Sequence, residues 1–136
     1  MELEFARRFG EAWRQPSPEG LVELLHPEVV LYQPHLPTMR GKQAALGEFR
    51  RLLRWLPGLH GEVDRACGSD GAVFIEWRMK APIGRGISIR VVDRFLLQDG
   101  LGIERAAVFD QVPLIAATLT HPRALAGFLR YRLGRR

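Results

Sequence analysis

A chain of 136 residues, of which 46% are apolar and 26% charged, fits one globular domain with a single hydrophobic core and is too short for two. The last sixteen residues hold five of the 20 Lys and Arg residues and none of the 15 Asp and Glu residues. The rest of the chain is therefore neutral despite the net charge of +5, which argues against nucleic-acid binding by the fold itself.

Cysteine content and hydropathy limit the class of protein further. The single cysteine, Cys67, excludes an intrachain disulfide and a cysteine-based zinc site. It fits a reducing compartment, so we expect a cytoplasmic protein. The N-terminus alternates charged with apolar residues, unlike the apolar core of a signal peptide, and no apolar run is long enough to span a bilayer.

The N-terminal residues predict two helices. Phe5, Phe9 and Trp13 recur at four-residue steps, which predicts an amphipathic helix over residues 2–15. A Pro-Ser-Pro segment stops this helix, and Ser17 can cap a second, short one.

The next segment predicts a strand, a loop and a long helix. Residues 29–32 are mostly β-branched or aromatic and predict a strand, and the proline-containing residues 33–41 predict a loop. Residues 41–56 predict a helix, because their apolar residues form one stripe with the arginines away from its centre. This stripe comprises Ala45, Leu46, Phe49, Leu52, Leu53 and Leu56.

Four strands are predicted next. Residues 60–67 and 72–80 predict two of them, separated by a turn. Residues 86–110 predict a β-hairpin, because two long runs rich in Ile, Val and Phe flank a short turn containing Asp99-Gly100. Helices segregated from a mostly antiparallel sheet make an α+β fold.

One acidic residue of this hairpin stands out. Alternate residues of a strand share a face, so Asp93 lies among the apolar residues Ile89, Val91, Phe95 and Leu97. A carboxyl group on an apolar face must be paired, hydrogen-bonded or protonated. Asp93 is therefore the first functional candidate: a catalytic group, a hydrogen-bonding group that positions a ligand, or a buried structural acid paired with an arginine.

The C-terminal residues predict a basic helical tail. Residues 113–119 and 123–133 predict helices separated by a break at His121-Pro122, and the second has an apolar stripe surrounded by arginines. Such a helix can lie on an anionic membrane surface or bind an acidic partner. It can equally fold back over a pocket mouth or a dimer interface, which we favour over membrane association.

Four segments resemble the nuclear transport factor 2-like superfamily, in particular the SnoaL-like polyketide cyclases and ketosteroid isomerases: FARRFGEAW, LVELLHPEVVLYQP, RGKQAALGEFRRLL and VVDRFLLQDGLGIERAAVFD. The resemblance implies a cone-shaped, curved, mostly antiparallel sheet wrapped on the N-terminal helices, with an apolar pocket and a homodimer through the sheet. We expect a SnoaL-like domain over residues 1–115 and a basic amphipathic tail over residues 116–136.

The resemblance to the isomerases is partial at the catalytic positions. The family's oxyanion-binding aspartic acid falls on Asp93, where a protonated carboxyl group would donate a hydrogen bond to an enolate. The catalytic tyrosine falls on Phe9, which has no hydroxyl, and the general base falls on Gln33, which cannot accept a proton. Steroid isomerisation by that route is therefore not expected.

Three further titratable residues are candidates. His35 lies in the loop that borders the pocket mouth in this fold, and it is either a substitute proton acceptor or simply exposed. The water-activating aspartate of related epoxide hydrolases falls near Glu76, for which a solvated cross-strand pair is the alternative. Asp110 matches the aromatic-Asp pair of SnoaL-like cyclases, or it caps the following helix.

The resemblance implies an enzyme without metal or cofactor. We expect proton-transfer chemistry such as cyclisation, isomerisation or dehydration of an apolar carbonyl compound, with Asp93, His35 and Glu76 as catalytic candidates. The residues expected to bind this compound are Phe9, Trp13, Gln33, Phe49, Phe95 and Asp110. The alternative is a non-catalytic ligand-binding or dimeric assembly module of the same fold.

Overall fold

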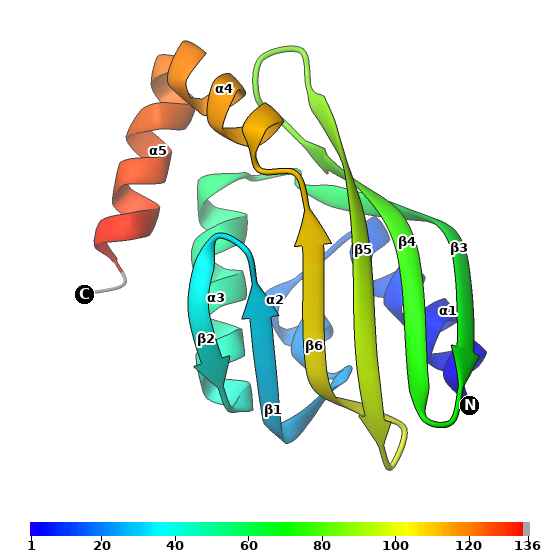
Figure 1. The fold of residues 1–136 in the computed structure, drawn as a ribbon. Coiled ribbons are helices and arrows are strands. Elements are labelled where there is room, and N and C mark those ends of the chain that lie inside the picture. Colours follow the sequence, from blue (N-terminus) through cyan, green and yellow to red (C-terminus); the bar gives the residue numbers. More distant parts are fainter. Residues whose placement is uncertain (135–136) are drawn as a thin grey trace.

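The computed structural model describes residues 1–134, which form one six-stranded sheet and five helices (Figure 1). The helices are α1 Glu2–Arg14, α2 Pro18–Val22, α3 Lys42–Trp55, α4 Val112–Thr120 and α5 Pro122–Leu133. The strands are β1 Leu25–Gln33, β2 Leu36–Arg40, β3 His60–Ser69, β4 Ala72–Ala81, β5 Ile87–Gln98 and β6 Leu101–Phe109.

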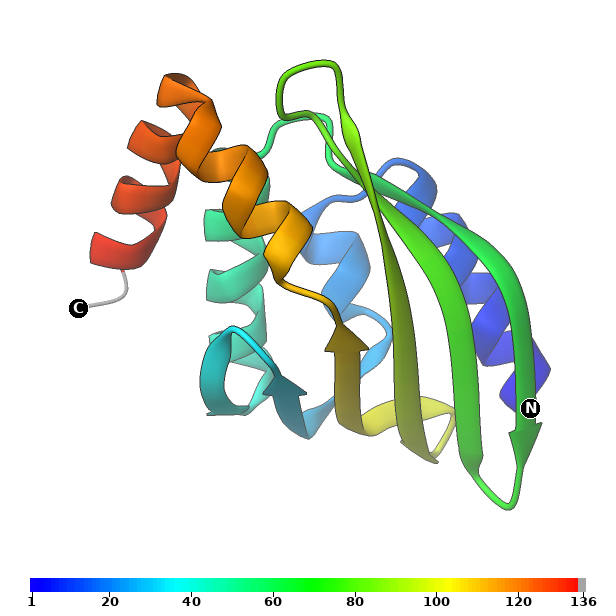
Figure 2. The same cartoon turned by 45° about the horizontal axis from the view of Figure 1, so that its top comes forward.

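The sheet has the order β2-β1-β6-β5-β4-β3 and is antiparallel except for the parallel pair β1–β6. It curves around α1, α2 and α3, which lie on its inner face (Figures 1 and 2). The predicted α+β fold with a curved, mostly antiparallel sheet is confirmed. The curvature encloses the core between the sheet and these helices.

The β5–β6 hairpin occupies the middle of the sheet, as predicted. Its two-residue turn places Asp99 at φ 54° and Gly100 at φ 77°, which is the backbone twist that joins two antiparallel strands most directly. The predicted alternation also holds: Ile89, Val91, Asp93 and Phe95 are buried on the inner face.

Helix α1 lies across the inner face of β3 and β4. Phe5, Phe9 and Trp13 are buried, and the ring of Phe9 packs against those of Trp77 and Phe95 at centroid distances of 5.3 and 5.7 Å. The predicted apolar stripe is therefore the part of α1 that enters the core.

One strand was missing from the sequence prediction. Residues 33–41 were predicted to form a loop, but residues 36–40 form β2, whose Met39 is the register partner of Leu31 in β1. The prolines of this segment lower its strand propensity. They are tolerated because β2 is an edge strand, with one row of backbone groups that needs no partner.

The C-terminal helices α4 and α5 form as predicted and fold back beside α3 (Figures 1 and 2). The indole of Trp55 stacks on the ring of Tyr131 at 5.1 Å, and its Nε1 donates a hydrogen bond to the Ala124 carbonyl. Gly127 allows this approach, because a Cβ there would lie 2.8 Å from the Trp55 ring. Among the described residues, no helix is long and apolar enough to cross a membrane.

Close packing at Gly61 makes a testable prediction. A Cβ at Gly61 in β3 would lie 2.5 Å from the Trp77 ring, so Gly61→Ala must displace this buried indole. We expect a loss of about 1–3 kcal/mol in the free energy of unfolding, measured by urea denaturation.

Gly47→Ala is the matched control. Gly47 lies within α3, and a Cβ there would meet only the end of the Arg51 side chain at 3.4 Å. Since alanine is the better helix former, this variant should gain up to about 1 kcal/mol. Equal effects of the two substitutions would contradict the packing argument.

Candidate functional site

A cavity of about 50 Å³ lies between the inner face of the sheet and helices α1, α3 and α4. Its walls are mainly apolar, and all three tryptophans of the chain, Trp13, Trp55 and Trp77, contribute to them. Polar side chains enter the wall at Gln33, His35, Glu48 and Arg105. A mainly apolar hollow with few polar groups is the usual form of a small-molecule site.

Asp93 is fully buried beside this cavity and is fully paired. Its Oδ1 accepts a hydrogen bond from Arg105 Nε at 2.7 Å, and its Oδ2 accepts bonds from Arg105 Nη2 at 3.0 Å and Trp77 Nε1 at 2.7 Å. The Arg105 guanidinium also lies over the Phe95 ring. This geometry matches the alternative of a structural acid paired with an arginine.

The cavity wall contains a second buried acid, Glu48 on α3, which is 1% exposed. Its carboxylate accepts hydrogen bonds from the Tyr131 hydroxyl of α5 and, at 3.4 Å, from Arg51 Nη2. The Tyr131 hydroxyl lies 3.5 Å from His35 Nε2, in the turn between β1 and β2. Three titratable groups from three distant segments therefore meet beside the cavity: Glu48 and His35 line it, and Tyr131 contacts both from outside the lining.

Glu48 and Tyr131 were not predicted as site residues, although the sequence carries a signal for Glu48. Glu48 lies on the same helical face as Ala45, Phe49 and Leu52, so it is an acid on the apolar stripe of α3, as Asp93 is on the apolar face of β5. Tyr131 gives no such signal, because its contact with Glu48 joins residues far apart in the chain.

Residues 6–105 match the SnoaL-like domain family. The chain belongs to this family. Among curated proteins, no match is found.

Solved structures agree with this SnoaL-like assignment. A putative SnoaL-like polyketide cyclase from Jannaschia sp. CCS1 aligns with a TM-score of 0.74 at 19% identity, over 85% of this chain and 90% of that chain. A hypothetical protein with a ketosteroid isomerase-like fold from Catenulispora acidiphila, in complex with trimethylamine, aligns with a TM-score of 0.77 at 14% identity. The alignment covers 86% of this chain and 93% of that chain. AclR, a putative hydroxylase from Streptomyces galilaeus, aligns with a TM-score of 0.73 at 18% identity, over 89% of this chain and 82% of that chain. At these identities the likeness shows the fold.

The SnoaL-like domain brings together some of the residues expected to form the site. Trp13, Gln33, His35 and Phe49 line the cavity. Phe9 and Phe95 instead pack against each other within the core, outside the cavity wall.

Asp110 and Glu76 lie away from the cavity of this SnoaL-like domain. Asp110 is exposed and accepts a hydrogen bond from the backbone N–H of Val112, the first residue of α4, although the N-cap position itself is Gln111, one residue after Asp110. Glu76 lies on the outer face of β4 and pairs with Arg65 at 3.4 Å. A cross-strand ion pair was the alternative for Glu76.

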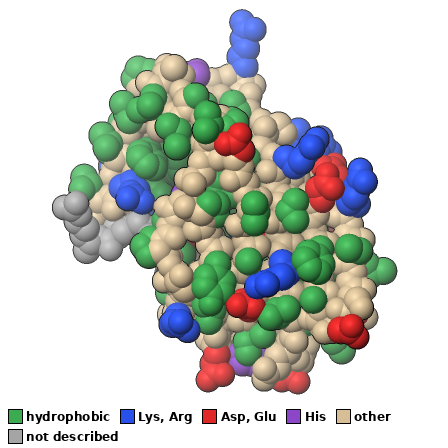
Figure 3. All heavy atoms as spheres, in the orientation of Figure 1, with side chains coloured by type: hydrophobic (Ala, Val, Ile, Leu, Met, Phe, Trp, Pro, Cys, Tyr) green, Lys and Arg blue, Asp and Glu red, His purple; other side chains and the backbone are tan. Residues whose placement is uncertain are grey.

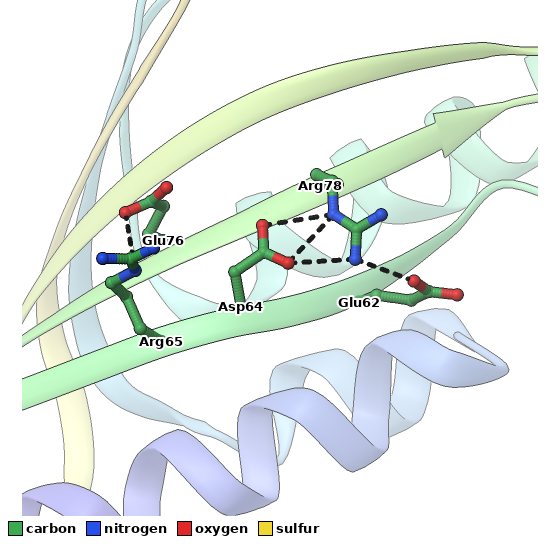
Figure 4. Close-up of polar contacts among 5 residues, drawn as sticks. All are labelled: Glu62, Asp64, Arg65, Glu76 and Arg78. Carbon is green, nitrogen blue, oxygen red and sulfur yellow. Dashed lines mark hydrogen bonds and ion pairs between the residues drawn. The ribbon is translucent and has the colours of Figure 1, made fainter.

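Figure 4 shows Glu76 within a row of charged side chains on β3 and β4. Arg78 in this row pairs with Asp64 and Glu62, and hydrogen bonding to Asp64 raises the pKa of Arg78 above its ordinary value. This charged row faces outward, so Glu76 takes part in surface pairing and not in the cavity.

The buried pair makes a second prediction. Asp93→Asn leaves the Arg105 guanidinium buried without its counter-charge, so we expect the free energy of unfolding to fall by about 3–5 kcal/mol. The double variant Asp93→Leu/Arg105→Met removes both charges and should recover most of this loss.

Glu76→Gln is the surface control for this experiment, measured by urea denaturation in the same buffer. Its partner Arg65 is 79% exposed, so the change should stay within about 0.5 kcal/mol. An Asp93→Asn variant as stable as Glu76→Gln would contradict a structural role for the Asp93 pair.

Proposed function

We propose that this SnoaL-like domain binds a small apolar carbonyl compound inside the cone and catalyses a proton transfer without a cofactor. The observation that carries the proposal is the meeting of Glu48, Tyr131 and His35 beside an apolar cavity. A carboxylate can accept a proton from a carbon acid held against it, and a neighbouring phenol can stabilise the charge that develops on a carbonyl oxygen.

The proposed roles follow from hydrogen-bonding capacity. Glu48 removes a proton from the carbon next to the carbonyl group and later returns one. When the substrate enters, the Tyr131 hydroxyl turns from Glu48 and donates its proton toward the enolate oxygen, with His35 Nε2 as its neighbour at 3.5 Å. Gln33 can hydrogen-bond the substrate but cannot take its proton, so its role is orientation.

Asp93 has a supporting role in this proposal. Its carboxylate accepts three hydrogen bonds, from Arg105 and Trp77, and unlike Glu48 it does not line the cavity, so a guest molecule does not reach it. Both partners line the cavity, and Asp93 therefore fixes the wall against which the substrate lies. Glu76, on the outer face, takes no part.

Entry of a substrate requires α5 to move. A cavity of about 50 Å³ has room for ordered water but not for a drug-sized molecule. Tyr131 of α5 closes the polar end through Glu48, while Trp55 of α3 stacks beneath Tyr131. Helix α5 packs chiefly on α3 and α4, so it can act as a lid.

The known relatives support a small-molecule role for the family. The similar structures include a putative polyketide cyclase, a putative hydroxylase and a protein in complex with trimethylamine. Binding of a small guest within the cone is consistent with these descriptions, and the acid–base groups of this chain favour proton transfer as its chemistry.

Deuterium exchange tests the proton transfer without knowledge of the natural substrate. The probe is 2-tetralone, an enolisable aromatic ketone, incubated in D₂O with the protein while deuterium incorporation next to the carbonyl is followed by NMR. We expect Glu48→Gln, which keeps the hydrogen bond from Tyr131, to reduce the protein-catalysed rate by about 100-fold or more.

Glu76→Gln is the matched control, because it makes the same chemical change on the outer face. It should leave exchange unchanged. Binding is followed separately through tryptophan fluorescence, since all three tryptophans line the cavity. A Glu48→Gln variant that binds the ketone and exchanges it at the rate of Glu76→Gln would refute Glu48 as the base.

The outer face of the sheet supports a second candidate, a dimeric assembly module. Tyr32, Phe74, Val92 and Val108 lie on this face and are 40–67% exposed. Figure 3 shows apolar side chains spread over the sheet with charged ones between them. An apolar surface interrupted by charges is typical of protein interfaces, and a second copy of the chain through this face is the partner we expect.

Substitution of Val92 tests this dimer. Val92 and Val108 are register partners at the middle of the outer face, so Val92→Asp places a charge where the two copies would meet. Analytical ultracentrifugation should show a dimer for the unmodified protein and a monomer for Val92→Asp. The control is Arg85→Glu, in the loop between β4 and β5. A monomeric unmodified protein would refute the dimer.

A further inference from the structure

A cleft of about 730 Å³ separates α3 from α5, outside the cavity described above. The two helices lie side by side in Figures 1 and 2. Five arginines line this cleft: Arg50, Arg51 and Arg54 from α3, and Arg123 and Arg130 from α5. No Asp or Glu side chain among residues 1–134 lines it, so the cleft is strongly positive.

The acidic residues nearby neutralise only part of this charge. Arg50 reaches Glu19 at 3.5 Å, where both side chains are more than half exposed, and Arg51 reaches Glu48 at 3.4 Å. Within residues 1–134, Arg54, Arg123 and Arg130 form no ion pair. Three guanidinium groups that line one cleft without a carboxylate partner make it electropositive, and an anion bound there balances this charge.

The cleft also has an aromatic wall. Trp55 and Tyr131, stacked at 5.1 Å, both line it. A concave surface with cations at the rim and two aromatic rings in the wall differs from an ordinary solvated row of charges. It offers an apolar contact together with charge-assisted hydrogen bonds.

We propose that the cleft binds a phosphate-bearing small molecule whose apolar part lies against Trp55 and Tyr131. Guanidinium groups bind phosphate oxygens through paired hydrogen bonds, and five of them match a ligand with more than one negative charge. A concave site between two helices suits a soluble phosphate better than a flat membrane surface does.

The cleft shares its aromatic wall with the cavity. Trp55 lines both, and Tyr131 lines the cleft while its hydroxyl bonds to Glu48 in the cavity wall. A ligand in the cleft therefore contacts the helix proposed as the lid. Binding in the cleft does not depend on the proposed proton transfer, because it is measured without turnover.

Isothermal titration calorimetry with inorganic pyrophosphate tests the site on the full chain. We expect one pyrophosphate per chain, and an affinity that falls with added NaCl. The charge-reversal variants Arg54→Glu and Arg130→Glu, one on each side of the cleft, should each weaken binding at least about tenfold. Arg85→Glu, an equal charge change outside the cleft, should bind as the unmodified protein does.

Two further ligands test the aromatic wall and the source of the phosphate. Phenyl phosphate should bind more tightly than methyl phosphate and change the tryptophan fluorescence, because only its ring can lie against Trp55. Vesicles of phosphatidylglycerol carry the same phosphate chemistry on a membrane, and co-sedimentation measures their binding.

Each result of these binding experiments either supports the proposed phosphate site or overturns it. Pyrophosphate binding that is weakened by Arg54→Glu and Arg130→Glu but not by Arg85→Glu supports the proposal. Binding of vesicles without binding of pyrophosphate would overturn it in favour of a membrane surface. No binding of pyrophosphate, or equal weakening by all three variants, would overturn it as well, while circular dichroism verifies that each variant is folded.

Discussion

The buried ion pair between Asp93 and Arg105 is the constraint on which the rest of the interior depends. Two charges removed from water are stable only when both are paired and hydrogen-bonded. Here Arg105 donates two hydrogen bonds to the Asp93 carboxylate, and Trp77 donates a third. The three side chains come from β5, β6 and β4, so the pair fixes the inner faces of three adjacent strands relative to one another. The same hydrogen bonds hold the cavity wall in place, because Trp77 and Arg105 form part of this wall.

The opposite end of the cone is built differently. There the buried acid is Glu48, and its partner Tyr131 comes from a helix that packs on α3 and α4. One acid is thus held by three paired strands and the other by a C-terminal helix that packs on α3 and α4, which we propose to act as a lid. We therefore propose a structural role for Asp93 and a chemical one for Glu48, with the C-terminal helices taking part in the site.

Local patterns in the sequence were sufficient for most of the fold. The period of apolar residues predicted α1, α3 and the hairpin, and the alternation along β5 predicted the buried position of Asp93. Strand β2 was missed because its prolines lower strand propensity, and its pairing with β1 at the sheet edge is a tertiary effect.

The site was harder to predict from the sequence than the fold was, for a physical reason. A pattern can show that an acid lies on an apolar face, but not which partner neutralises it. Asp93 and Glu48 carry the same signal, yet Arg105 pairs with one and Tyr131 with the other through contacts between distant segments. The basic cleft likewise exists only because α5 folds back beside α3, which brings arginines separated by about half the chain to one place.

Hydrogen exchange of two indole N–H groups, followed by NMR, tests the central claim that a rigid cone is closed by a separable lid. The Trp77 indole donates to Asp93 inside the cone, and the Trp55 indole donates to the Ala124 carbonyl of α5. We expect Trp77 to exchange only through global unfolding and Trp55 to exchange at least about 100-fold faster through local opening of α5. Equal protection of the two groups, or faster exchange at Trp77, would contradict the account.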